Sequence, residues 1–112
     1  MNMTSFSRLY RSNELSAREM PNGGKVKLIH TGKMTFAEWH FKKGTHLAGH
    51  SHPHEQITRV LEGIIELTIE GNRFTLHAGD TLHIASDAKH SGRILEECRL
   101  IDVFTPVRED LK

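Results

Sequence analysis

The segment AGHSHPHEQ, residues 48–56, carries imidazole groups at alternate positions and ends on an amide. Residues two apart in a β-strand point to the same side, so His50 and His52 would present their rings to one face. Neutral imidazoles are the commonest protein ligands for transition metals, and two on one face could fill adjacent coordination positions. Taken alone, such a pair is more often a pair of surface histidines. Four of the nine histidines lie within residues 46–54, however, and this concentration requires an explanation.

The amide of Gln56 follows these histidines where a carboxylate could complete a metal site. Neutral imidazoles and a carboxamide leave a divalent cation with its whole formal charge, whereas a glutamate would cancel one unit. This favours proton-transfer chemistry on an oxygen-rich anion over an oxygenase, whose iron typically has one carboxylate ligand. The alternative is that Gln56 is a tolerated substitution in a protein without a metal.

The elements that must position these residues are short strands. From residue 25 onward, runs rich in Val, Ile, Leu, Thr and Phe alternate with glycine-containing breaks, at a spacing of roughly 8–12 residues that is typical of a β-sandwich or barrel. The clearest strand is 64–70, where apolar and polar residues alternate, and residues 70–73 follow it as a hairpin turn. The breaks are expected at Gly32, Gly44, Gly49, Gly63, Gly71, Gly79 and Gly92.

Length and composition predict one soluble domain. A chain of 112 residues suits a single hydrophobic core, so we expect an N-terminal arm over residues 1–24, extended or a short helix, and a β-barrel domain over 25–112. The net charge of +1 gives no basic excess for binding nucleic acid. No apolar run could span a bilayer, the N-terminus has no signal-peptide pattern, and Cys98 is the only cysteine. A cytoplasmic protein without membrane partners is the expectation.

The closing strand, expected over residues 100–105 and ended by Pro106, carries a second group of interest. Alternation puts Asp102 and Phe104 on one face, so a Phe104 that points into the barrel brings Asp102 with it. A carboxylate in an apolar interior is costly unless it has a partner or a task. Arg108 could supply either. It could form a buried ion pair with Asp102, or it could clamp a substrate carboxylate while Asp102 acts as general acid and base.

The spacing of these residues resembles the first motif of the cupins, G-x5-H-x-H-x3-4-E-x6-G, with only the glutamate replaced. Gly44, His50, His52, Gln56 and Gly63 occupy its positions. The second cupin motif is partly present: Gly79-Asp80 opens a strand and His90 follows the next turn, although Ala85-Ser86 replaces the usual proline region.

The cupin resemblance implies an all-β fold, a single-domain RmlC-like jelly-roll barrel with a short N-terminal arm, and a metal bound inside it by His50, His52, Gln56 and His90. His54 has no ligand role in this pattern and is expected to be a rim residue. The bound cofactor would be one divalent transition metal, and nickel, manganese, zinc, iron and copper all suit such ligands. Small cupins usually pair through barrel faces and the arm, which implies a homodimer.

A closer resemblance rests on four blocks: HSHPHEQ, VLEG, AGDT and the C-terminal DVFTPVRED. Together they look like the small pectin-degradation cupins of the KdgF type, from about residue 25 to the end. That family converts 4,5-unsaturated uronates, which are small anionic sugars, into linear 5-keto-4-deoxyuronate. The resemblance implies that Asp102 moves the proton and that Phe104 and Arg108 line the sugar site. The alternatives are a different metal-dependent cupin enzyme, such as a dioxygenase or sugar isomerase, and a non-catalytic barrel that binds a small molecule.

Overall fold

Antiparallel strands make up the fold in the computed structural model, which describes residues 7–112. Short 3-10 helices lie near both ends of the described chain, η2 over Ser12–Glu14 and η3 over Glu109–Leu111. The all-β prediction is confirmed. The strands are β1 Arg18–Glu19, β2 Lys25–His30, β3 Thr35–Phe41, β4 His46–His50, β5 Glu55–Ile69, β6 Asn72–Leu76, β7 Thr81–Ile84 and β8 His90–Thr105.

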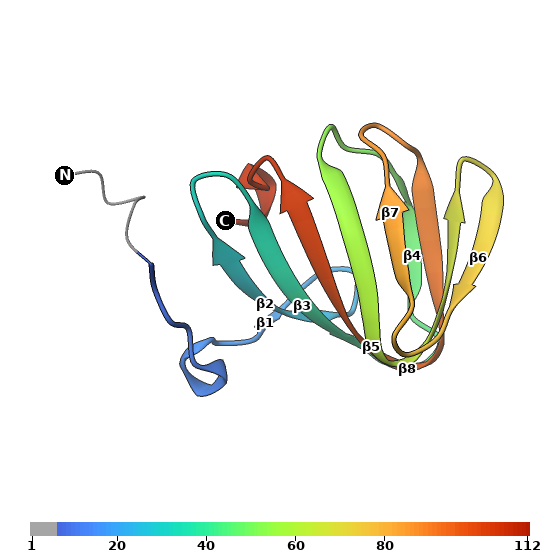
Figure 1. Ribbon diagram of the computed structural model, residues 1–112. Helices are drawn as coiled ribbons and strands as arrows, with labels where there is room; N and C mark the ends of the chain where they lie inside the picture. The colour runs from blue at the N-terminus through green and yellow to red at the C-terminus, as the bar shows by residue number, and fades with distance from the viewer. Residues whose placement is uncertain (1–6) are drawn as a thin grey trace.

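The two long strands, β5 and β8, pair with each other and bend at one end of the barrel, so that two halves of the sheet face each other (Figure 1). The C-terminal half of β8 pairs with β3, whereas its N-terminal half pairs with β4. Likewise β5 pairs with β7 through its first residues and with β6 through its last. Each half of the sheet therefore supplies one wall of the barrel. The two ends of β5 and the two ends of β8 lie at its open mouth (Figure 1).

Gly63 lies inside a strand, which corrects the break expected there. The pairing of β5 with β8 shifts register between Val60 and Ile65, and Gly63 within this bulge has a φ of +87°. The bulge changes which residues point inward: the buried positions of β5 are even-numbered up to Val60 and odd-numbered from Ile65. Gly49 and Gly92, also expected as breaks, lie within β4 and β8.

Substitution of Gly63 by alanine is expected to destabilise the fold by at least about 2 kcal/mol, because the left-handed conformation is strained and the new Cβ overlaps the Glu97 carbonyl. Gly44 is the matched control: it has the same φ of +87°, but a Cβ there meets nothing within 4 Å. Gly44→Ala should therefore cost only about 1 kcal/mol. Urea unfolding of both variants measures the difference, and equal losses would contradict the close approach.

The core lies between the two walls and leaves a cavity above it. Trp39 and Phe41 stack with ring centroids 5.1 Å apart, and apolar residues of β5 and β8 pack around them. Cys98 is fully buried in this core, and burial, with the charge of Asp102 second, raises the pKa of its thiol to about 11. The cavity above has a volume of about 360 Å³.

The N-terminal segment joins the barrel before residue 25. Part of the predicted arm, residues 1–6, lies outside the described residues, and η2 accounts for the short helix considered there. β1 then adds to the edge of the sheet beside β2, and Arg18 donates a hydrogen bond of 2.6 Å to the Leu111 carbonyl of the C-terminal tail. In the described part of the chain, no helix has the length and apolar character needed to cross a membrane.

Candidate metal centre

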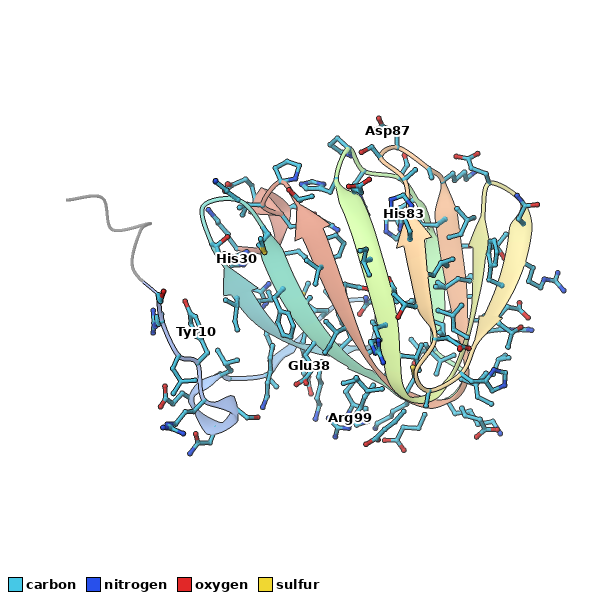
Figure 2. The ribbon with its side chains drawn as sticks, viewed as in Figure 1. Tyr10, His30, Glu38, His83, Asp87 and Arg99 are labelled. Atoms are coloured by element: carbon cyan, nitrogen blue, oxygen red, sulfur yellow. The ribbon has the colours of Figure 1, made fainter. Side chains whose placement is uncertain are left out.

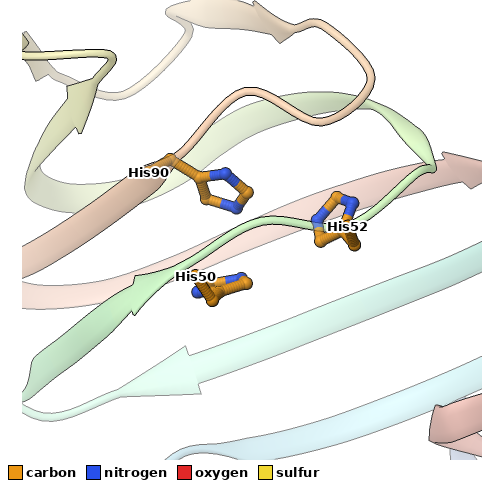
Figure 3. Close-up of side chains that lie close together, drawn as sticks. All are labelled: His50, His52 and His90. Carbon is orange, nitrogen blue, oxygen red and sulfur yellow. The ribbon is translucent and has the colours of Figure 1, made fainter.

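Three imidazole rings converge at the mouth of the barrel (Figure 3). His50 ends β4, His52 lies in the segment after it, and His90 begins β8 directly opposite His50 in the pairing of the two strands. Their candidate ligand nitrogens all lie within 4.8 Å of one another. The structure thus brings together the three histidines that the sequence predicted as ligands, from parts of the chain up to forty residues apart.

The outer nitrogen of each ring is held by a backbone carbonyl. Nδ1 donates to a carbonyl two residues away in each case, at 3.0 Å for His50, 3.1 Å for His52 and 2.9 Å for His90. Because a carbonyl only accepts hydrogen bonds, Nδ1 carries the proton and Nε2 keeps its lone pair. This arrangement orients metal-binding histidines in general, and the three residues therefore fit a divalent transition metal.

Burial favours the neutral form of two of these rings. The pKa of His52 is lowered first by burial and then by the positive charge of Arg108, and burial is also the largest cause of the lowered pKa of His90. A neutral imidazole is the form that binds a metal. His50 is exposed at the mouth of the cavity.

Gln56 reaches the same point from β5, and its orientation is fixed by a chain of hydrogen bonds. Its Nε2 donates to Thr58 Oγ1 at 2.9 Å, and that hydroxyl donates to Asp102 Oδ1 at 2.6 Å. The hydroxyl has one proton and gives it to the carboxylate, so it must accept from the amide. The amide oxygen of Gln56 consequently faces His52 Nε2, 3.2 Å away.

The close approach of His52 Nε2 and Gln56 Oε1 supports Gln56 as a fourth metal ligand. With the proton of His52 on Nδ1, both Nε2 of His52 and Oε1 of Gln56 present lone pairs, which repel each other unless a cation or a proton lies beside them. A metal bound by both atoms removes that repulsion. The donor set therefore fits a site of three imidazoles and one amide, and Gln56 as the fourth ligand stays a prediction.

Asp102 points into the cavity from β8 and is 8% exposed. Burial raises its pKa to about 6, although hydrogen bonds from Thr58 and Gln56 and the charge of Arg108 act in the opposite direction. The buried Asp102–Arg108 ion pair considered from the sequence is not formed, because Arg108 pairs with Asp110 instead. Asp102 is thus a carboxyl group that titrates near neutral pH, in hydrogen-bonded connection with Gln56.

Asp102→Asn is expected to stabilise the metal-free protein at neutral pH. Well below pH 3.8 the carboxyl group is protonated in both the folded and the unfolded chain. As the pH rises through 3.8 and on to about 6, the unfolded chain loses its proton first, so stability falls. The loss amounts to about 2–3 kcal/mol by pH 7. Asparagine removes it, and unfolding curves of both proteins at pH 4 and pH 7 will show the difference. If the unfolding free energies of Asp102→Asn and the wild type differed by the same amount at both pH values, this interpretation would be wrong.

Phe104 and Arg108 complete the cavity on the side of the C-terminal tail. The Arg108 guanidinium lies over the Phe104 ring, 4.6 Å from its centroid, and the same ring meets His52 edge-on at 5.7 Å. Both residues line the cavity. The predicted site residues therefore gather at one cavity, which all of them line except His52, whose ring lies beside those of His50 and His90. His52 comes from the segment between β4 and β5, and Arg108 comes from the tail.

His54 lies beside the site without joining the cluster. Its ring is 5.4 Å from that of His52, and its Nε2 donates to the Val107 carbonyl at 3.2 Å. Four histidines without a predicted role have partners elsewhere: His30, His40, His77 and His83. His83 on β7 and His30 on β2 are labelled in Figure 2. His83 is exposed and contacts Glu55 at 3.0 Å, and His30 contacts Thr35 at 2.8 Å.

Thr58 is the site residue that the sequence interpretation missed. It lies two residues after Gln56, pairs with Asp102 across β5 and β8, and is buried. The same alternation that links Asp102 to Phe104 would have put Thr58 on the inner face with Gln56. That signal was present, but a threonine in a strand is too common to be singled out by type.

The comparisons with known proteins agree with this geometry. The cupin domain matches residues 37–104, and the chain belongs to the cupin family. Over 106 residues it is 34% identical to the pectin degradation protein KdgF of Dickeya dadantii (strain 3937), a match covering 92% of this chain and 96% of that one. The chain is therefore a homologue of KdgF.

Two solved structures share the fold over nearly the whole chain. KdgF from Halomonas sp. is 26% identical, with a TM-score of 0.89 over 96% of this chain and 100% of that one. An RmlC-like cupin from Shewanella frigidimarina NCIMB 400 is 24% identical, with a TM-score of 0.90 over 98% and 100% of the two chains. The predicted RmlC-like barrel is thus confirmed.

Proposed function

We propose that this protein is a metal-dependent enzyme of pectin degradation that converts 4,5-unsaturated uronates into linear 5-keto-4-deoxyuronate. One observation carries the proposal: Asp102, a carboxyl group whose pKa burial raises to about 6, faces a cavity that Arg108 and two of the three clustered histidines also line. The likeness to KdgF supports the pathway.

The proposed reaction is an isomerisation and needs no co-reactant. Opening the sugar breaks the bond between C1 and the ring oxygen while the proton of the C1 hydroxyl passes to that oxygen, which leaves an aldehyde at C1 and an enol at C5. The proton of the enol oxygen is lost and a proton is added to C4, so that the C4–C5 double bond becomes a single bond and C5 becomes a ketone. The chemistry needs a group that gives and takes protons near neutral pH, and a means of holding an anion.

The residues of the cavity meet these needs. Asp102 would donate the proton to C4 and recover one from the enol oxygen, since both of its forms are populated near its pKa. Arg108 would bind the substrate carboxylate, and Phe104 would form the wall beneath the sugar. A divalent cation bound by His50, His52, Gln56 and His90 would supply Lewis acidity toward the sugar oxygens.

The test is an assay of the metal-loaded protein with an unsaturated uronate released from pectin by a lyase. We expect the ultraviolet absorbance of the conjugated double bond to disappear faster than it does in buffer with the same metal. Metal-loaded protein that gives no acceleration would contradict the proposal. Oxygen consumption would then indicate a dioxygenase, and thermal stabilisation by a uronate without turnover would indicate a binding protein.

A homodimer remains a prediction. Apolar side chains at the outer surface of β5, Ile57 at 48% and Leu61 at 40% exposed, are available to a second copy. Light scattering at micromolar concentration measures the mass directly.

A further inference from the structure

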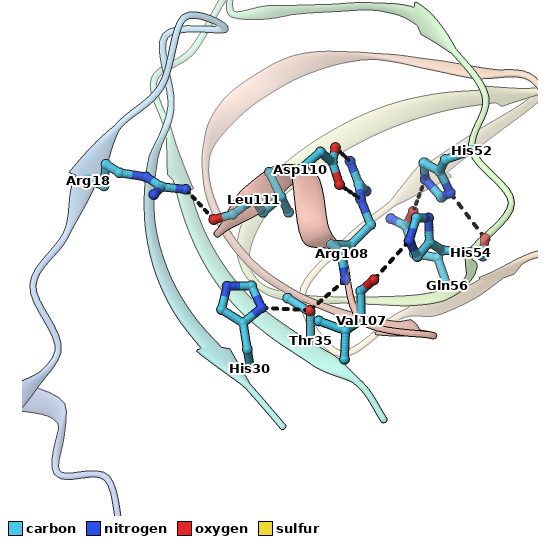
Figure 4. A network of polar contacts seen from close by, with 10 residues as sticks. All are labelled: Arg18, His30, Thr35, His52, His54, Gln56, Val107, Arg108, Asp110 and Leu111. Carbon is cyan, nitrogen blue, oxygen red and sulfur yellow. Dashed lines mark hydrogen bonds and ion pairs between the residues drawn. The ribbon is translucent and has the colours of Figure 1, made fainter. Parts of the chain in front are cut away.

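Arg108 reaches the cavity with one edge of its guanidinium already occupied. Its Nε and Nη2 donate to Oδ1 and Oδ2 of Asp110 at 2.9 and 2.8 Å (Figure 4). A guanidinium has five N–H groups in a planar fork, so this pair uses two of them and leaves the edge formed by Nη1 and Nη2. That edge can bind a second carboxylate in the same two-bonded geometry.

Further contacts fix the tail that carries this group. The Arg108 backbone N–H donates to Thr35 Oγ1 at 2.9 Å, and His54 holds the carbonyl of Val107. The Phe104 ring below the guanidinium restricts its plane, and Asp110 restricts its direction within that plane. The Arg108 side chain is 12% exposed and lines the cavity, whereas Asp110 is 61% exposed and lies outside the lining.

We propose that Asp110 is a positioning residue that turns Arg108 so that its free edge faces the cavity and receives the carboxylate of the substrate. This inference rests on the proposed function, because it assigns the substrate group that Arg108 binds. It makes Asp110 a determinant of specificity for uronates over neutral sugars, although Asp110 itself touches no substrate.

The direction in which substrate affinity changes when Asp110 is removed distinguishes a positioning role from a purely electrostatic one. Arg108 lowers the pKa of Asp110 to about 2, so Asp110 is an anion at neutral pH and cancels part of the positive charge at the rim. If charge alone mattered, removing Asp110 would strengthen the binding of an anionic substrate. If positioning matters more, removing it frees the guanidinium to rotate and binding weakens.

The experiment compares Asp110→Asn with the wild type in the uronate assay. We expect KM to rise roughly tenfold while kcat changes less than about twofold, because a held carboxylate contributes to binding before the chemistry. The thermal midpoint and the metal content should stay unchanged. Glu109→Gln is the matched control: it removes one charge from the neighbouring residue, whose carboxylate contacts Lys112 and not Arg108. KM should not change in this control.

A binding measurement keeps the inference testable without turnover. Calorimetry with D-galacturonate should show weaker binding to Asp110→Asn than to the wild type. A wild type that binds galacturonate in this Asp110-dependent way but turns over no unsaturated uronate would overturn the proposed reaction and keep the positioning role. An unchanged or lowered KM in Asp110→Asn with an active wild type would overturn the positioning role alone. A wild type that neither binds nor converts a uronate would overturn both.

Discussion

Asp102→Asn should lower the turnover of unsaturated uronate by about a hundred- to ten-thousand-fold, the range typical of losing a general acid or base. Asparagine keeps the size of the side chain and an oxygen that can accept the hydrogen bond from Thr58, but it has no carboxyl proton to exchange. The metal content should stay at the wild-type level, because Asp102 lies outside the cluster of candidate ligands and asparagine keeps an oxygen that can accept hydrogen bonds from Thr58 and Gln56. Initial rates and metal analysis of the same preparation measure both quantities.

Asp80→Asn is the matched control for this variant. Asp80 lies in the turn before β7 and is exposed, and its carboxylate accepts a hydrogen bond from the backbone of His77. Its replacement changes the net charge equally and should leave turnover unchanged. Two results would reject the proposed role of Asp102: turnover by Asp102→Asn within a few-fold of the wild type, or loss of metal from that variant, which would mean that Asp102 serves the metal site and not the proton.

His90→Ala is expected to weaken metal binding by at least about a hundredfold, and turnover should fall with it. His90 is 5% exposed, and its Nε2 is directed toward the cluster because Nδ1 is bound to the Ala88 carbonyl. Removing the ring leaves too few imidazole donors to compete with water for the cation. Metal titration of protein purified without a chelating resin gives the affinity.

His54→Gln tests whether the ligands have been distinguished correctly from their neighbours. His54 lies on the same side of the chain as His50 and His52, but its ring nitrogen is engaged with the Val107 carbonyl. Glutamine can keep a donor for that carbonyl, so the variant should bind the metal as tightly as the wild type. A loss similar to that of His90→Ala would mean that the assignment of ligands is wrong.

Much of the site could be predicted because strand geometry is periodic. Within β8, alternation determines which side chains share a face, and this was enough to bring Asp102 and Phe104 into the barrel. His52 lies after the end of β4, so its place in the cluster comes from the family motif and not from strand parity. Spacing also identified His90, although forty residues separate it from His50. What the sequence predicted correctly is the part that depends on parity and on the family motif.

The remainder depends on contacts that periodicity does not encode. The glycines were interpreted as breaks, but a glycine permits a bulge inside a strand as well as a turn, and only the register of β5 and β8 distinguishes the two at Gly63. The partner of Arg108 was uncertain for a related reason. Asp110 is two residues away, and the turn of η3 brings its carboxylate to the guanidinium, whereas the expected burial of Asp102 favours that residue as the partner of Arg108.

The constant parity of the buried positions in β8 constrains how this chain can change in length. Every buried position of β8 from His90 to Phe104 is even-numbered, while β5 changes parity at its bulge. Deleting a single residue between His90 and Asp102 would leave both in the sequence, yet one of them would point to solvent. Insertions and deletions among active homologues should therefore gather in turns such as residues 85–89, and the interval between these two residues should keep its length even where its sequence drifts.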